Sequence, residues 1–338
     1  MEYHHKNFEI KTRSALKSTI RGIPQGSILG PLFFIVYINS LPDFLPLSKT
    51  CIMYADDTTI ISPTSPQNKT NTIEETITLA SDVCSSLNLQ INKSKTININ
   101  FTTTNRSINP KIDNSTPTEP MATATTTKFL GITIDSNLTW HNHITTLENK
   151  LSSSLYAIRR IRAITNKKTA KIAYFALFEC HIRFGIIAWG SASENQVKKI
   201  QILQKRALRT IECLQPHDHC KPYFISNQIL TVPSLYILET TKLLKLNPPK
   251  VRGECHKYNL RNVELKYDVQ QHRLTKTSKT PQIMGSKMFN ALPDNLKQIQ
   301  NNKTFAKKLK DYLIERPYYS LNEFFEDHNP FLRSRPIT

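Results

Sequence analysis

The chain of 338 residues lacks the features that mark secreted, membrane-spanning and disulfide-stabilised proteins. Its first residues carry charges and histidines in place of an apolar segment, so they do not predict a signal peptide. The most apolar stretch, Ile172 to Trp189, contains an acid, a histidine and an arginine and is too polar to span a bilayer. The six cysteines form no Cys-x-x-Cys pair, which favours reduced thiols. We therefore expect an intracellular protein of the cytoplasm and nucleus that crosses no membrane.

Acidic residues are scarce relative to basic ones. The chain has 45 Lys and Arg against 26 Asp and Glu, a net charge of +19, and its pI is near 9.7. This imbalance favours a polyanionic partner such as nucleic acid, although charge alone does not identify the polyanion. Much of the excess lies in residues 150–215, which contain 13 Lys and Arg, three Glu and no Asp, a net charge of +10.

Hydrophobic periodicity predicts alternating strands and helices in the first 140 residues. We expect a short strand within residues 7–20, a buried helix over 28–38, two short strands over 51–61, a helix over 72–89, a strand over 91–101, a long hairpin or loop over 102–127 and a strand from Lys128. This alternation indicates an α/β or α+β sheet domain. After Trp140 the pattern becomes helical through residue 215, and residues 216–338 contain short helical pieces separated by prolines.

The last helix of the basic segment, near residues 197–214, has two contrasting faces when its positions are projected at about 100° per residue. Its apolar face comprises Val197, Ile200, Leu203, Ala207, Leu208, Ile211 and Leu214. Its basic face comprises Lys198, Lys199, Lys205, Arg206 and Arg209. One interpretation is a core helix with a solvated charged face, and the other is a nucleic-acid-binding face. The lack of any acid between Val197 and Ile211 favours the second, because solvated faces usually mix charges.

Two adjacent aspartates, Asp56 and Asp57, lie in the stretch CIMYADDTTIIS. An Asp pair is most often an exposed turn. Here apolar and β-branched residues flank it on both sides, which predicts a turn at the end of a buried hairpin. Acids in such a position usually pair with a cation or bind a metal, and paired carboxylates suit Mg²⁺.

Several segments in a fixed order resemble the reverse transcriptases of non-LTR (LINE, jockey-like) retrotransposons. They are RGIPQGSILGPLFFIVYINSLP, MYADDTTI, LNLQINKSKTININF, KFLGITIDSNLTWHNHI, AYFALFECHIRFGIIAWG, IQILQKRALRTI, HKYNLR, MFNALPDNLK and YYSLNEF. The resemblance implies an α+β fold with a partial polymerase palm over residues 1–140, a basic helical thumb-like domain over 141–215 and a polyprotein tail over 216–338. It also implies an RNA-directed DNA polymerase that uses Mg²⁺, or Mn²⁺ as an alternative, with an RNA template, a DNA primer or target and deoxynucleotide triphosphates.

The resemblance assigns roles to individual residues. Asp56 and Asp57 would be catalytic metal ligands, Tyr54 would pack near the primer end, and Lys95 would lie near the departing pyrophosphate. The template and nucleotide loop would comprise Pro24, Gln25, Gly26 and Ser27, and the primer grip would comprise Phe129, Leu130 and Gly131. Without the family, Lys95 reads as a solvated lysine at a strand end, and the apolar residues of the primer grip read as ordinary core.

The pattern of the family is broken at one essential point. Reverse transcriptases hold two metal ions with a third carboxylate from an earlier strand, in a block resembling FxDxxxAFD. In this chain the first aspartate is Asp43, and only Glu2 and Glu9 are acidic before it. We therefore expect a polymerase truncated in front, which lacks the fingers and the first palm strand and is not catalytic alone.

Two alternatives to a polymerase fragment remain open. One is a non-enzymatic nucleic-acid-binding protein that kept only the thumb-like helices in use, and the other is a remnant of a transposable element without function. A structural zinc site is a further possibility at four metal-ligating residues that lie close together in the sequence, but their spacing fits no standard zinc motif, which argues against it. These residues are Cys213, His217, His219 and Cys220.

Overall fold

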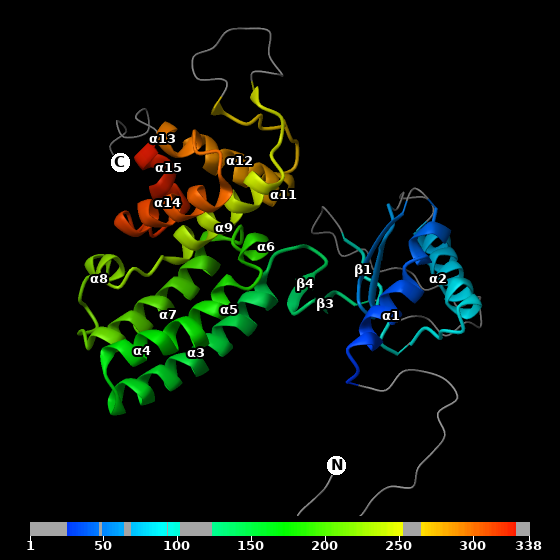
Figure 1. Cartoon of the computed structure of the whole chain (residues 1–338), viewed down its shortest axis with the longest axis horizontal. Coiled ribbons are helices and arrows are strands. Elements are labelled where there is room, and N and C mark those ends of the chain that lie inside the picture. Colours follow the sequence, from blue (N-terminus) through cyan, green and yellow to red (C-terminus); the bar gives the residue numbers. More distant parts are fainter. Residues whose placement is uncertain are drawn as a thin grey trace, which may run out of the picture. The chain divides into compact units, whose positions relative to one another are not determined.

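The computed structural model describes residues 26–46, 49–63, 69–92, 94–101, 124–252 and 265–328. The chain divides into two compact units, Met1–Thr96 and Ile97–Thr338 (Figure 1). The segment 7–20, for which a strand is predicted, lies outside the described residues, as does most of the loop predicted over 102–127.

The first unit contains a hairpin and two helices, in agreement with the predicted order of elements. Its elements are α1 (Leu29–Ile38), the 3₁₀ helix η1 (Leu41–Phe44), β1 (Thr50–Tyr54), β2 (Asp57–Ile61) and α2 (Lys69–Ser86). β1 and β2 pair in antiparallel fashion. A small core joins the end of α1, η1 and α2 through the buried side chains of Ile38, Leu41 and Val83. The predicted helices and the paired strands are thus confirmed.

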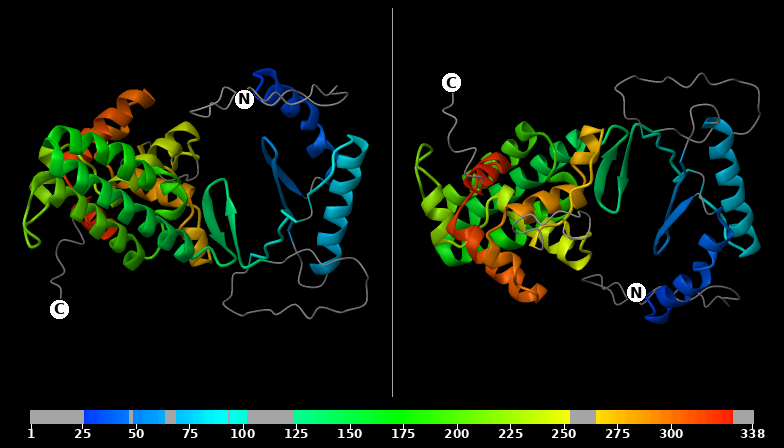
Figure 2. Two further views of the ribbon diagram at one scale, coloured as in Figure 1. Left: turned by 90° about the horizontal axis from the view of Figure 1, so that it is seen from below. Right: turned by 90° about the horizontal axis from the view of Figure 1, so that it is seen from above.

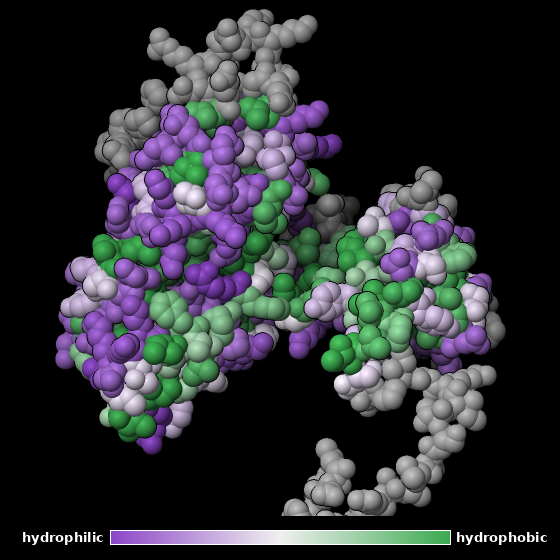
Figure 3. Space-filling model, in the orientation of Figure 1, coloured by the Kyte–Doolittle hydropathy of each residue, from purple (hydrophilic) through white to green (hydrophobic). Residues whose placement is uncertain are grey.

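The expectation that the first helix is buried is wrong. Within α1 only Ile38 is buried, whereas Phe33 is 52% and Val36 68% exposed. The helix is apolar on all sides, so it would need neighbours on all sides to be buried. In the described part of this unit, Ile38 and the partly buried Phe34 pack in the small core, and Figure 3 shows apolar side chains at the surface.

The strand predicted over residues 91–101 is also wrong. Residues 94–101 form no strand, although the carbonyl oxygen of Asn98 accepts a hydrogen bond from the Ala124 N–H at 3.0 Å. The strand predicted from Lys128 is instead a hairpin of β3 (Thr126–Phe129) and β4 (Ile132–Asp135). Alternation of side chains stabilises a strand only where a partner strand is available, and each sheet in the described residues has just two strands.

The second unit is helical beyond the β3–β4 hairpin. Its helices are α3 (His141–Ile164), α4 (Lys167–Ala173), the π-helix η2 (Tyr174–Glu179), α5 (Cys180–Arg183), α6 (Ile186–Trp189), α7 (Glu194–Glu212), α8 (Lys221–Ser226), α9 (Val232–Leu246), α11 (Thr275–Ser278), α12 (Pro281–Ala291), α13 (Asp294–Lys297), α14 (Asn302–Glu315) and α15 (Leu321–His328).

These helices form two layers around one core. α3 packs along α7 in the first layer, and α9 connects it to a second layer in which α12 and α14 pack on α9 (Figure 1). Most buried apolar residues of this unit form one cluster, from Ile144 in α3 to Phe324 in α15. The β3–β4 hairpin lies at one end of the layers, against α3 (Figure 2). The mixture of helices with small sheets is compatible with the predicted α+β class, and the predicted palm, thumb and domain boundaries stay predictions.

A buried amide ties the two layers together. Gln204 of α7 is fully buried, and its Nε2 donates to the Tyr174 hydroxyl at 2.9 Å and to the Leu230 carbonyl at 2.8 Å. Its Oε1 accepts from the Val232 N–H at 3.1 Å. This N–H is at the start of α9, where it has no partner within its own helix. One side chain therefore bonds two separate segments, η2 and the entry into α9. Within the described ranges, every helix is too short or too polar to cross a membrane.

Candidate functional site

The two aspartates lie at the tip of the β1–β2 hairpin. Tyr54 pairs with Asp57, so Ala55 and Asp56 form a two-residue turn. Ala55 has φ of 52°, a left-handed conformation that costs a residue other than glycine about 1–2 kcal/mol. The prediction of two strands joined at the aspartates is confirmed. The predicted burial of this turn is wrong, because Tyr54 is 66% exposed and both aspartates are exposed, so no buried charge needs compensation here.

The tip can be tested for its fit to metal ions. Mg²⁺ keeps several waters and is commonly held by one or two carboxylates together with substrate phosphates, so Asp56 and Asp57 fit one exposed ion. A two-ion arrangement needs further ligands. Among the residues that the structure describes, no group of three or more His, Cys, Asp or Glu side chains could hold a metal. The hairpin therefore fits one weakly held Mg²⁺ and does not fit a two-ion centre.

The loop before α1 is described only at its end. Pro24 and Gln25 lie outside the described residues. Gly26 has φ of 87°, and a Cβ there would meet nothing within 4 Å, so its backbone conformation rather than packing favours glycine. The Ser27 Oγ accepts a hydrogen bond from the Gly30 N–H at 3.1 Å, which satisfies one free donor of the first helical turn. These two residues thus shape the entry into α1.

Lys95 follows α2 in an exposed turn instead of a strand. Its backbone N–H donates to the Asn92 carbonyl at 3.1 Å. No hydrogen bond or ion pair joins its ammonium group to Asp56 or Asp57, all three of which lie in described residues. The structure thus shows no direct bond between Lys95 and the aspartates, and the role of this lysine stays a prediction.

The predicted primer-grip residues form the turn of the β3–β4 hairpin. Phe129 pairs with Ile132, and the two turn residues have positive φ, 43° at Leu130 and 85° at Gly131. Two positive values in a two-residue loop correspond to a type I′ turn, which matches the twist of the strands. A Cβ on Gly131 would lie 3.1 Å from the Phe184 ring. This close approach fixes the turn against the residue that follows α5.

The apolar face predicted for α7 faces the core, since Ile200, Leu203 and Leu208 are buried. Three of the five predicted basic residues are exposed, and these are Lys198, Lys199 and Arg206. The remaining two, Lys205 and Arg209, are partly buried.

Lys199, Lys205 and Arg209 are basic residues of α7 with structural contacts, and the Lys199 Nζ lies 4.0 Å from a carboxylate oxygen of Glu148. The Lys205 Nζ lies 3.6 Å from the centre of the Tyr319 ring, and burial lowers the pKa of this lysine. The Arg209 Nη2 donates to the Asp218 carbonyl at 3.1 Å. The basic face therefore combines exposed charges, suited to a polyanion, with charges that stabilise the fold.

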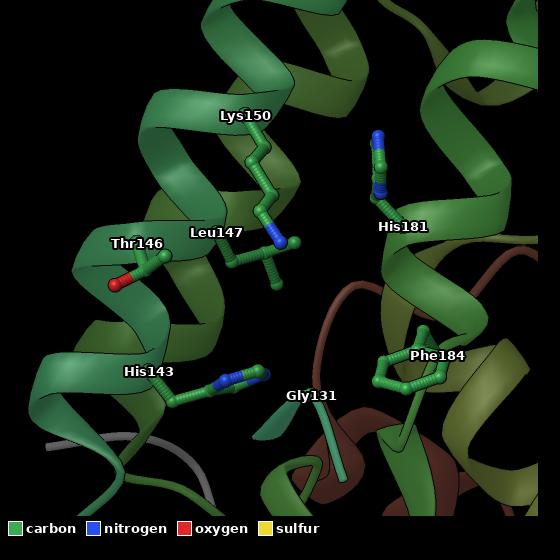
Figure 4. Close-up of a pocket in the computed structure, with 7 residues that line it drawn as sticks. All are labelled: Gly131, His143, Thr146, Leu147, Lys150, His181 and Phe184. Atoms are coloured by element: carbon green, nitrogen blue, oxygen red, sulfur yellow. The ribbon is translucent and has the colours of Figure 1, made fainter. Parts of the chain in front are cut away.

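A pocket between α3 and α5 is a feature that the sequence did not single out (Figure 4). We call it the α3–α5 pocket, and its lining consists of Gly131, His143, Thr146, Leu147, Lys150, His181 and Phe184. The available signal was the spacing of His143, Thr146 and Lys150, which places three polar side chains along one face of a helix.

Comparisons with known proteins show a likeness to one family. The model of the family described as reverse transcriptase (RNA-dependent DNA polymerase) matches residues 3–134, which include both hairpin turns. The RNA-directed DNA polymerase from mobile element jockey of Drosophila melanogaster is 27% identical over 209 residues, covering 59% of this chain and 22% of the relative.

Two further relatives from the same organism show a similar extent of likeness. The probable RNA-directed DNA polymerase from transposon X-element is 27% identical, covering 61% of this chain and 24% of the relative. The probable RNA-directed DNA polymerase from transposon BS is 29% identical, covering 62% of this chain and 23% of the relative. The chain thus spans less than a quarter of the length of these relatives. No solved structure matches the chain significantly.

Proposed function

We propose that this chain, whose residues 3–134 belong to the reverse transcriptase family, is a part of a jockey-like RNA-directed DNA polymerase that does not polymerise DNA by itself. The observation that carries this proposal is the β1–β2 tip. It presents Tyr54, Asp56 and Asp57 in the order of the family's motif, at an exposed turn where a substrate could reach the carboxylates.

In this proposal the tip holds one Mg²⁺, or Mn²⁺ as an alternative, beside the phosphates of a deoxynucleotide. The bound ion would neutralise charge on the phosphates. Gly26 and Ser27 belong to the loop under an RNA template and the nucleotide, Lys95 serves the departing pyrophosphate, and Phe129 to Gly131 contact a DNA primer. The described residues supply two carboxylates at the tip and no third, which is the reason for expecting inactivity.

Primer extension tests the proposed inactivity. We expect no incorporation above background when the purified chain is given an RNA template, a DNA primer, deoxynucleotides and Mg²⁺. Asp43→Ala is the control, because Asp43 is an exposed residue of the same unit. If the parent chain and Asp43→Ala incorporate deoxynucleotides and Asp56→Ala does not, the chain is an active polymerase and the proposal is refuted.

Metal binding is measured separately from activity. Mn²⁺ broadens the NMR signals of nearby nuclei, so titration should broaden the backbone signals of residues 54–58 first. We expect Asp56→Asn to remove this selective broadening and Asp43→Asn to leave it unchanged. If Mn²⁺ broadens the signals around Asp43 as much as those of residues 54–58, the tip is an ordinary exposed turn.

A second candidate function, nucleic-acid binding without catalysis, is favoured by the exposed basic residues of α7. Each phosphate contact contributes about 0.7–0.9 to the slope of log affinity against log salt. We therefore expect Arg206→Ala to lower this slope by about that amount, whereas Lys205→Ala leaves it nearly unchanged, because its ammonium group lies on the Tyr319 ring. Equal slopes in both variants and the parent chain would show that the basic face is merely solvated.

A further inference from the structure

The α3–α5 pocket contains a buried hydrogen-bond donor without a partner. His143 is 7% exposed, and its Nε2 has no hydrogen-bond partner among the described residues. Its Nδ1 accepts a hydrogen bond from the Thr133 N–H at 3.4 Å, which selects the tautomer that carries the proton on Nε2. Burial, and secondarily Lys150, lower the pKa of His143, so the neutral ring persists at neutral pH. His143 therefore places in the pocket wall a buried N–H that has no hydrogen-bond partner among the described residues.

Lys150 supplies a positive charge to the same pocket. It lies seven residues after His143, two helical turns along one face of α3. Helical side chains lean toward the N-terminus, and Figure 4 shows the Lys150 chain extending back along α3 toward His143. His181 and Phe184 form the opposite wall, and no carboxylate lines the pocket. The lining thus combines a cation and an N–H donor without an acidic neighbour.

The size of the pocket limits what it can accept. Its cavity volume is about 30 Å³, and it is partly open to solvent. A water molecule needs about 10–15 Å³ by this measure, so the pocket has room for one or two oxygen atoms and excludes a base or a sugar ring. Charge-assisted hydrogen bonds to anionic oxygens are the interactions that an ammonium group and an N–H donor form best.

We propose that the α3–α5 pocket binds the anionic oxygens of a phosphate group, with Lys150 and the His143 Nε2–H as donors. The proposal deepens the proposed function and rests on it, because a nucleic-acid strand is the phosphate source that the basic helical segment favours. Free inorganic phosphate offers the same chemistry, and it is examined as a separate arm of the test.

The test compares Lys150→Met with Lys168→Met in the full chain. Both lysines are exposed residues of the same helical segment, and only Lys150 lines the pocket, so the pair is matched in charge and chemistry. Fluorescence anisotropy with a single-stranded oligonucleotide at 0.1 M salt measures affinity. We expect Lys150→Met to weaken binding by about tenfold or more, as for a lost charge-assisted hydrogen bond, and Lys168→Met by about two- to threefold.

Inorganic phosphate is titrated in the second arm, with the ¹⁵N signal of His143 Nε2 as the readout. A shift with the oligonucleotide alone identifies a strand phosphate as the ligand, and a shift with inorganic phosphate as well identifies a general phosphate site. Both results support the proposal if Lys150→Met abolishes the shift. His143→Phe, which keeps an aromatic ring beside Trp189, removes the donor, and we expect it to weaken oligonucleotide binding as Lys150→Met does.

Two results would overturn the proposal. One is equal loss of affinity in Lys150→Met and Lys168→Met, and the other is a His143 signal that no phosphate source moves, which would mean that the N–H bonds an ordered water only. These measurements read binding, whereas the proposed lack of polymerase activity is read by primer extension. Failure of one is therefore distinguishable from failure of the other.

Discussion

Replacement of Gln204 by leucine should strongly destabilise the helical unit. The change keeps the approximate size of the side chain but removes the partner of three buried groups, which are the Tyr174 hydroxyl, the Leu230 carbonyl and the Val232 N–H. Tyr174 is itself fully buried, and burial raises the pKa of its hydroxyl, so neither water nor ionisation offers that group a substitute partner.

The magnitude follows from the groups left without partners. Each buried donor or acceptor that loses its partner costs about 1–3 kcal/mol. Three such groups give about 3–9 kcal/mol, and leucine returns part of this because it is less costly to bury than an amide. We expect a net loss of about 3–5 kcal/mol in the free energy of unfolding, which is a large fraction of the stability of an ordinary domain.

Urea unfolding followed by tryptophan fluorescence measures this loss selectively. The two tryptophans of the chain, Trp140 and Trp189, both belong to the helical unit. Gln201→Leu is the matched control, because Gln201 lies almost one turn earlier on α7, is 3% exposed and has no partner for its side-chain Nε2. We expect that control to change stability by less than about 1 kcal/mol. Similar losses in both variants would refute the reasoning.

Two further variants test other features of the helical unit. Burial raises the pKa of Glu179 above its ordinary 4.5, and Arg183 opposes this shift. The folded chain therefore binds the proton more tightly than the unfolded chain. The resulting stabilisation is fully present below pH 4.5 and is lost as the pH rises through the raised pKa. We therefore expect the free energy of unfolding of the parent chain, measured relative to Glu179→Gln, to fall as the pH rises above 4.5, and a difference that is constant with pH would contradict this. Gly131→Ala should lower the free energy of unfolding by about 1–2 kcal/mol, because alanine is strained at φ of 85° and its Cβ would press on Phe184. An unchanged unfolding midpoint would contradict this prediction.

Secondary structure could be predicted from the sequence more successfully than burial and tertiary contacts. The strand pair at Asp56 and the amphipathic helix α7 follow from local patterns of side chains, and both are present in the structure. Burial of α1 and a strand over 91–101 depend on what other segments supply, and local patterns carry no such information. The α3–α5 pocket depends on the approach of His181 to Lys150 across two helices, so only the fold could reveal it.

The two units differ in how completely each forms its own core, and this difference bears on function. In the helical unit one buried cluster extends from Ile144 to Phe324, so its basic face and the α3–α5 pocket are held by packing within the unit. In the first unit the described core is a small cluster around Leu41, while α1 leaves apolar side chains exposed. Catalysis by a reverse transcriptase depends on accurate positioning of carboxylates, which needs a rigid support, whereas binding of a polyanion needs mainly a stable surface of positive charge. We therefore expect nucleic-acid binding to be retained in this chain under conditions in which it does not extend a primer.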